Sequence, residues 1–182
     1  MRGFTLIETV IVIAFSSIMM LTIAVLAYNF NKISVYETTS AKSSDSANAL
    51  MREIESLTFP ADAVLQTHTF SGSTRTSSLT ALVLEIPSID SSGNAISNTY
   101  DYAAFYSVGT NAYRLLEKNA LSTRAPGTKL LSTTVSALTF SYDNADFTKV
   151  SIVTVDLQTQ ALAKQEVISN HLHEQIRLRN HL

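Results

Sequence analysis

The N-terminal part of the chain carries an uncharged run that is long enough to cross a lipid bilayer. Thr9 to Tyr28 gives 20 consecutive residues without a charged side chain. As an α-helix with a rise of about 1.5 Å per residue, this segment would span about 30 Å, the thickness of a bilayer's hydrocarbon core. We therefore expect a membrane-spanning helix near the N-terminus, and this expectation constrains how the remaining residues can fold.

Few charged residues flank this run. Arg2 and the amino terminus precede it and Lys32 follows it, so the positive-inside bias is slight and favours an N-terminus in the cytoplasm. The main alternative is a cleavable secretory signal, with "VLA" at 25–27 as the cleavage site before Tyr28. The n-region "MRG" is short for such a signal, and the apolar core exceeds the usual length of about 7 to 15 residues. We expect a single-pass protein with an extracytoplasmic C-terminal domain.

The remainder of the chain suits one modest domain. The chain has 182 residues, and its hydrophobic fraction of 46% is inflated by the N-terminal run. A net charge of −2, with 13 basic and 15 acidic residues scattered along the chain, offers no basic stripe for a nucleic-acid backbone, so direct nucleic-acid binding is not expected. The absence of cysteine removes disulfides, thiol nucleophiles and cysteine metal clusters.

One carboxylate, Glu8, stands at the start of the apolar run. Thr5 and Glu8 have the S/T-x-x-E spacing of a capping box, in which the acid satisfies backbone N–H groups at a helix start. A charged side chain inside lipid is costly and usually faces protein or an opposite charge. Glu8 is therefore predicted to act as a local cap, to pair with a cation, or to do both.

Glu8 also belongs to a longer motif. Residues 3 to 8 read "GFTLIE" and are followed at once by the apolar run. This arrangement resembles the N-terminus of type IV prepilins and of the pseudopilins of type II secretion. The resemblance implies that a prepilin peptidase cuts between Gly3 and Phe4 and that Phe4 becomes the N-methylated terminus. It also implies that Glu8 guides assembly, and a pairing with the Phe4 amine of a neighbouring subunit would satisfy both charges.

The predicted helix continues beyond the membrane. No glycine or proline occurs between Phe4 and Phe59, and Pro60 marks the end of the helical pattern. Apolar residues recur at helical spacing beyond the lipid run, at Ile33, Tyr36, Ala47, Leu50, Met51, Ile54 and Leu57. One helix of about 80 Å is expected. In residues 38–48, Ser, Thr, Asp and Asn lower the helix propensity, so local bending or fraying is expected there.

After Pro60, short β-rich runs alternate with turn signals, such as "SGS" at 71–73 and "DSSGN" at 90–94. These runs predict an antiparallel sheet. Two of them place apolar residues on one face, namely Leu82, Leu84 and Ile86 in the first and Leu138, Phe140 and Tyr142 in the second. The stripe of Leu50, Ile54 and Leu57 can cover these faces. The expected fold class is α+β, with the outer half of the long helix packed on the sheet.

The β-rich part also resembles minor pseudopilins and minor pilins. Residues 100–119 read as a hairpin, 135–147 as an aromatic strand and loop, and 149–159 as the next strand, while 176–180 match an I-x-L-R-N ending. Residues 160–175 fit a helix as well as a loop and strand. The resemblance implies a leader at 1–3, a transmembrane and filament-core helix at 4–30, the outer half of that helix at 31–59, and a pilin-like globular domain at 60–182.

The sequence shows no catalytic constellation. Its five glycines form no nucleophile elbow, P-loop or dinucleotide fingerprint. Several residues have side chains that bind metals, namely His171, His173 and His181 near the C-terminus, Asp143 with Asp146, and Asp90 with Asn94. The histidines lack a carboxylate at a useful spacing, and Asp and Asn are ordinary turn residues. We predict no enzyme activity, no metal and no cofactor.

The resemblance, together with the lack of a catalytic constellation, leads us to expect a non-enzymatic structural subunit of a type IV pilus or type II secretion pseudopilus, with a minor role in filament initiation or tip assembly. Its expected partners are other pilin or pseudopilin subunits, the prepilin peptidase, the inner-membrane assembly platform and membrane lipid. Its expected location is the cytoplasmic membrane and then the filament. The alternative is a single-pass or secreted β-rich extracytoplasmic binding domain unrelated to pili.

Overall fold

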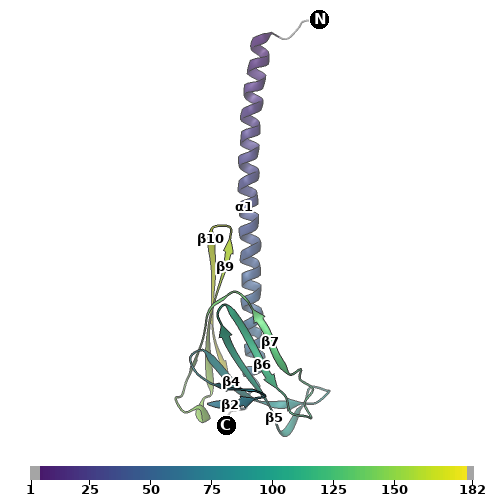
Figure 1. Cartoon of the computed structure of the whole chain (residues 1–182), viewed down its shortest axis with the longest axis vertical. Coiled ribbons are helices and arrows are strands. Elements are labelled where there is room, and N and C mark those ends of the chain that lie inside the picture. Colours follow the sequence, from purple (N-terminus) through teal and green to yellow (C-terminus); the bar gives the residue numbers. More distant parts are fainter. Residues whose placement is uncertain (1–4, 180–182) are drawn as a thin grey trace.

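A computed structural model of the chain describes residues 5–179 (Figure 1). One helix, α1 (Leu6–Thr58), is 53 residues long. Its N-terminal half projects away from the rest of the molecule, while its C-terminal half lies against the β-strands (Figure 1). All strand pairs among the described residues are antiparallel. The α+β class predicted from the sequence is therefore confirmed.

The strands form three antiparallel sheets rather than the one sheet predicted. The first has the order β1-β4-β5-β6-β7, with β1 at Ala63–Val64, β4 at Ala81–Ile89, β5 at Ala95–Val108, β6 at Asn111–Glu117 and β7 at Gly127–Ser132. The second has the order β10-β9-β8, with β8 at Val135–Tyr142, β9 at Ile152–Ala163 and β10 at Glu166–Arg177. The third pairs β2 (Thr67–Phe70) with β3 (Ser73–Thr76), and a short 3₁₀ helix, η1, covers Phe147–Lys149.

The first two sheets separate between β7 and β8. Only residues 133–134 connect these strands, yet β8 pairs with β9 instead of folding back on β7. The carbonyl of Thr134 accepts a 2.7 Å hydrogen bond from the amide of Gln160 in β9, and the amide of Val135 donates to the Thr110 carbonyl at 2.9 Å. The connecting backbone is therefore already paired outside β7, which explains why a single sheet does not form.

The core lies between α1 and the two larger sheets. The helix stripe predicted to be buried is buried, since Leu50, Ile54 and Leu57 are 1%, 0% and 9% exposed. The first strand face predicted from the sequence is also buried, and it consists of Leu82, Leu84 and Ile86. In the second predicted face, Leu138 and Phe140 are buried and Tyr142 is partly exposed. The predicted hairpin at 100–119 is formed by β5 and β6, which turn at Gly109 with a φ of +60°.

The serine-rich part of α1 is a regular helix, so the fraying expected for residues 38–48 is not found. Ser43 Oγ lies 3.2 Å from Thr159 Oγ1 of β9 and accepts a 2.9 Å hydrogen bond from Asn170 Nδ2 of β10. Ser46 Oγ lies 2.9 Å from Ser132 Oγ of β7. Small hydroxyl side chains thus let the strands approach the helix closely, and these tertiary hydrogen bonds offset the low helix propensity.

The segment 160–175 forms the last third of β9, a turn and most of β10, so the helical alternative for it is wrong. The turn contains Lys164, whose φ of +57° lies in the left-handed region that favours glycine or asparagine. The resulting β9–β10 hairpin rises beside α1 toward the projecting half of the helix (Figure 1).

Candidate functional site

The N-terminus of α1 is closed by a complete capping box. Thr5 is the N-cap, and Glu8 Oε2 accepts 2.9 Å hydrogen bonds from both the Thr5 amide and Thr5 Oγ1. In return the Glu8 amide donates to Thr5 Oγ1 at 3.3 Å. The cap predicted for Glu8 is therefore present. Gly3 and Phe4, the predicted processing residues, lie outside the described residues.

The cap occupies one oxygen of the Glu8 carboxylate. Within residues 5–179, Oε2 accepts both bonds from Thr5, and Oε1 has no hydrogen-bond donor. A carboxylate has about four lone-pair sites, so Oε1 can accept a charged donor from another molecule without loss of the cap. Capping and pairing with a cation are thus compatible at the same side chain.

The surface of α1 that follows Glu8 is apolar and uncovered. The large hydrophobic side chains from Leu6 to Phe30 have exposed fractions between 49% and 86%. The helix contains an 18-residue window of mean hydropathy 2.7, and none of that window is buried. This part of α1 is long and apolar enough to cross a membrane.

The hydroxyl groups inside the apolar run are bonded within the helix. Thr9 Oγ1 donates to the Thr5 carbonyl at 3.0 Å, Ser17 Oγ to the Ile13 carbonyl at 2.8 Å, and Thr22 Oγ1 to the Ile18 carbonyl at 2.9 Å. Such bonds remove polar groups from the helix surface without any need for water. The run therefore presents a surface suited to lipid or to other apolar helices.

The histidine pair on β10 is held by a carboxylate of the neighbouring strand. His171 Nε2 lies 2.8 Å from Asp156 Oδ1, and His173 Nδ1 lies 3.3 Å from Asp156 Oδ2. Partial desolvation acts to raise the pKa of Asp156, but its contacts with the two imidazoles outweigh this effect and lower the pKa below its ordinary value. No group of three His, Asp or Glu side chains among residues 5–179 is arranged to hold a metal ion. His181 lies outside the described residues.

The loop aspartates singled out in the sequence serve local turns. Asp90 Oδ1 accepts the amides of Ser92 and Asn94 at 2.8 and 2.9 Å. Asp143 accepts the hydroxyl of Ser151 at 2.7 Å, and Asp146 Oδ1 accepts the amide and hydroxyl of Thr148. These carboxylates cap turns, as Asp and Asn commonly do, and none belongs to a group of three metal-binding side chains among the described residues.

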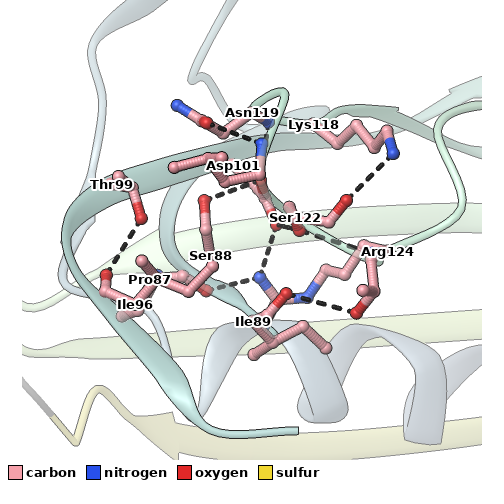
Figure 2. A network of polar contacts seen from close by, with 12 residues as sticks. Pro87, Ser88, Ile89, Ile96, Thr99, Asp101, Lys118, Asn119, Ser122 and Arg124 are labelled. Atoms are coloured by element: carbon pink, nitrogen blue, oxygen red, sulfur yellow. Dashed lines mark hydrogen bonds and ion pairs between the residues drawn. The ribbon is translucent and has the colours of Figure 1, made fainter. Parts of the chain in front are cut away.

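A buried ion pair between β5 and the segment that joins β6 to β7 was not predicted from the sequence. Asp101 of β5 is fully buried, and its Oδ2 lies 2.8 Å from Arg124 Nη1 (Figure 2). Its carboxylate also accepts hydrogen bonds from Ser88 Oγ, the Asn119 amide and Ser122 Oγ at 2.9, 2.8 and 2.6 Å. The network fastens the segment between β6 and β7 to β4 and β5.

Burial alone would raise the pKa of Asp101, but the four hydrogen bonds that it accepts outweigh burial and hold the pKa below its ordinary value. An acid in the middle of the aromatic stretch "YDYAAFY" was the available sequence signal, because a strand interior tolerates a charge only with partners. The partner Arg124 lies 23 positions away in a loop, and no local pattern identifies it.

A shallow pocket of about 250 Å³ lies beside this network and is lined by His68, Thr69, Tyr100, Tyr102, Glu117, Lys118 and Asn119. The ring of His68 stacks on Tyr102 with centroids 3.8 Å apart, and its Nε2 lies 3.2 Å from Glu117 Oε2. Lys118 Nζ donates to the Ser122 carbonyl at 2.9 Å. The polar groups of the pocket thus take part in contacts that hold the strands and loops together.

Comparison of the chain with protein-family models, with curated proteins and with solved structures finds no match. Function is therefore inferred from the residues of this chain. The feature that carries the most chemical information is the start of α1, where a capped acid with one open oxygen precedes an uncovered apolar surface.

Proposed function

We propose that the chain is a non-enzymatic structural subunit of a type IV pilus or type II secretion pseudopilus, a minor subunit that acts in filament initiation or at the tip. The observation that carries this proposal is the sequence "GFTLIE" at 3–8, placed at the start of a helix whose large apolar residues from Leu6 to Phe30 are uncovered. Such a surface needs lipid before assembly and apolar neighbours after it. One helix can meet both needs in turn.

Glu8 would supply the register of assembly in this proposal. Cleavage after Gly3 creates a positively charged amine on Phe4, and that amine needs a counter-ion when helices pack in a medium of low dielectric constant. The open Oε1 of Glu8 in a neighbouring subunit is a suitable acceptor, and the Thr5 cap can persist while it binds. Both charges are then satisfied at one axial position.

The remaining parts of the proposal concern location and partners. The N-terminus would face the cytoplasm and the β-rich domain the extracytoplasmic side, with the subunit held in the cytoplasmic membrane by α1. A prepilin peptidase would process it, and an inner-membrane assembly platform would move it into contact with other pilin or pseudopilin subunits. We propose no cofactor and no direct nucleic-acid partner.

A second candidate function is a single-pass or secreted β-rich binding domain unrelated to pili. The observation that favours it is the complete cap, since Thr5 and Glu8 satisfy each other without any partner molecule. In that case the match to "GFTLIE" is a coincidence. If the domain is secreted, cleavage before Tyr28 would release it from the helix.

The mature N-terminus distinguishes these functions. We expect mass spectrometry of the full chain, expressed with a prepilin peptidase, to find N-methylated Phe4 as the first residue. Gly3→Val adds a bulky side chain at the predicted cleavage point and is expected to retain the three-residue leader; the unaltered chain in a host without the peptidase is the matched control. A first residue of Tyr28 would establish a secreted protein, and normal cleavage of Gly3→Val would remove the peptidase from the proposal.

A further inference from the structure

The tip of the β9–β10 hairpin is fastened to α1 where the apolar run ends. Lys164 Nζ donates to Asn31 Oδ1 at 2.9 Å and lies 5.6 Å from the centroid of the Tyr28 ring. Glu166 Oε1 lies 2.7 Å from Lys32 Nζ. These contacts join residues about 130 positions apart in the chain, and they fix the height of the tip along the helix.

That height coincides with the edge of a bilayer when α1 spans it. Lys32 is the first charged residue after the apolar run, and Tyr28 is of the residue type that collects at the membrane–water interface. The polar headgroup layer adds about 5 to 7 Å to each side of the hydrocarbon core. Two strand residues cover about 7 Å, so the last two residue pairs of the hairpin lie within or next to that layer.

The last residue pairs of the hairpin face in two directions. Ala163 and Ile168 are each 5% exposed. Leu162 and Val167 are paired in register and are 68% and 65% exposed. Further along the same strand face, the residues that alternate with Val167 are polar, namely Ser169, His171, His173, Gln175 and Arg177. The two apolar side chains at the tip are therefore uncovered within residues 5–179 and differ in character from the rest of their face.

We propose that the tip of the hairpin, residues 161–168, docks onto the surface of the lipid bilayer. Leu162 and Val167 enter the boundary between headgroups and acyl chains, and the ammonium group of Lys164 lies among the lipid phosphates. The proposal rests on the membrane-spanning part of the proposed function and is independent of filament assembly. The hairpin becomes a second contact with the membrane that holds the β-rich domain upright beside its helix.

Size and charge favour lipid over a second copy of the chain at this surface. A stable protein interface buries at least about 1,000 Å² in total, and two aliphatic side chains at a hairpin tip provide only a small part of that area. The same two side chains are sufficient for a local interfacial contact, since the helix already holds the tip at the membrane. Lys164 adds a positive charge that suits anionic headgroups.

Site-directed spin labels can test the docking because the chain has no cysteine of its own. We would label Val167→Cys and Gln175→Cys, two exposed positions on the same face of β10 that lie about 27 Å apart along the strand. The full chain would be reconstituted at one copy per nanodisc of phosphatidylethanolamine and phosphatidylglycerol. Collision rates with oxygen, which concentrates in lipid, and with a water-soluble nickel chelate report the surroundings of each label.

The expected result is an oxygen-to-nickel collision ratio several-fold higher at Val167→Cys than at Gln175→Cys. In Lys164→Gln the ratio at Val167→Cys should fall, and in phosphatidylcholine alone it should fall by a similar factor. Equal ratios at the two positions would overturn the proposal. A second result would also overturn the proposal. If the ratio at Val167→Cys stays high in detergent without lipid, and the spectra broaden through contact between spins, then the tip contacts another copy of the chain.

A third label separates failure of this inference from failure of the membrane span. Ile18→Cys lies in the middle of the uncovered apolar run, and its label should show the highest oxygen-to-nickel ratio of the set. If Ile18→Cys contacts lipid and Val167→Cys contacts water, the span stands and the docked tip is wrong. If Ile18→Cys itself contacts water, the span is wrong and the docked tip fails with it.

Discussion

Two carboxylates of this chain illustrate how the surroundings of a residue decide its role. Asp101 is buried and accepts four hydrogen bonds, one of them from Arg124, so its charge is fully satisfied inside the domain. Glu8 is exposed and satisfied on one oxygen only. A fully bonded acid holds strands and loops together, whereas an acid with an open oxygen at an apolar surface is suited to a partner.

The variant Glu8→Gln separates capping from pairing. Glutamine serves at this position of a capping box as well as glutamate does, so membrane insertion, cleavage and the fold of the domain should be unchanged. The Phe4 amine of a neighbour would lose its counter-ion, and crosslinking between subunits in cells should fall by at least about tenfold. Glu37→Gln, an exposed exchange on the same helix, is the matched control. Unchanged crosslinking in Glu8→Gln would leave the acid as a cap alone.

Removal of the buried charge at Asp101 should destabilise the domain. In Asp101→Asn the guanidinium of Arg124 loses its counter-ion, and loss of one partner of a buried pair costs about 3 to 5 kcal/mol. The exchange Asp156→Asn alters a half-buried acid whose partners, His171 and His173, lie at the surface, and should change the free energy of unfolding by less than about 1 kcal/mol. Denaturant titration of both variants measures the difference. Equal stabilities would show that Arg124 finds water or another acceptor.

The same residue predicts how stability depends on pH. The pKa of Asp101 is lower in the folded protein than in the unfolded chain. The contribution of Asp101 to the free energy of unfolding is therefore fully present above the pKa of the unfolded chain, about 3.9. This contribution is lost as the pH falls through the pKa of the folded protein, where the carboxylate takes up a proton. Unfolding measured from pH 6 down to pH 2 should therefore show a smaller loss of stability in Asp101→Asn than in the unaltered chain. Parallel curves would contradict this assignment.

At the scale of elements, α1 is one continuous helix with two different surroundings. Its first half presents large apolar side chains on all sides, and its second half buries a single stripe against the sheets. Within the second half, small hydroxyl residues such as Ser43 and Ser46 bond to the strands. The helix is therefore held by hydrophobic packing near its C-terminal end and by polar contacts nearer its uncovered apolar half.

The buried stripe can be tested in a soluble fragment that begins near Lys32. Ile54 is fully buried, so Ile54→Asp places an unpaired charge in the core and should lower the free energy of unfolding by several kcal/mol. Asn48→Asp adds a charge at an exposed position of the same helix and should change it by about 0.5 kcal/mol or less. Denaturant melts compare the two, and an unchanged midpoint for Ile54→Asp would place this face in solvent.

Local sequence signals were sufficient for the long helix and for several of the strands. The extent of α1 follows from the lack of glycine and proline before Pro60, and strands β4 and β8 follow from their alternating apolar residues. The fraying expected at 38–48 was wrong because helix propensity describes an isolated helix, whereas Ser43 and Ser46 bond to strands distant in the sequence. The split into separate sheets and the pairing of Asp101 with Arg124 also depend on distant contacts.

The candidate site also has a part that could be predicted from local sequence and a part that could not. The cap at Glu8 was predictable because it involves residues three positions apart. The fastening of Lys164 and Glu166 to the end of the apolar run was not, since neither the hairpin nor its distance from the helix can be derived from local spacing. Cleavage at Gly3 and modification of Phe4 remain predictions, because these residues lie outside the described part of the chain.

The whole molecule consists of a domain, which includes the second half of α1, and a projecting first half of α1 that shares few contacts with it. The large apolar residues from Leu6 to Phe30 are exposed, and among the described residues Tyr28 and Asn31 contact the domain through Lys164. The β-rich domain is thus complete without the membrane-length part of α1. Its stability should be set by the core between the sheets and the second half of the helix.

Removal of the first 31 residues should therefore cost the domain little. The chain without them loses one exposed hydrogen bond and one weak cation–π contact, which together contribute less than about 2 kcal/mol. Thermal melts followed by the near-ultraviolet circular dichroism of the tyrosines, with both proteins in the same detergent, measure this difference. A loss as large as that expected for Ile54→Asp would show that the projecting half packs on the domain.

The continuity of α1 also fixes a direction around the helix axis. In an ideal helix, with about 100° of rotation per residue, Glu8 would project roughly a quarter turn away from the side on which Ile54 meets the sheets. A copy that engages Glu8 would then approach from a side that the β-rich domain does not cover. In a row of identical copies, Glu8 and the β-rich domain would then face different neighbours around the helix axis. The angle between these two directions would influence whether the array winds to the left or to the right.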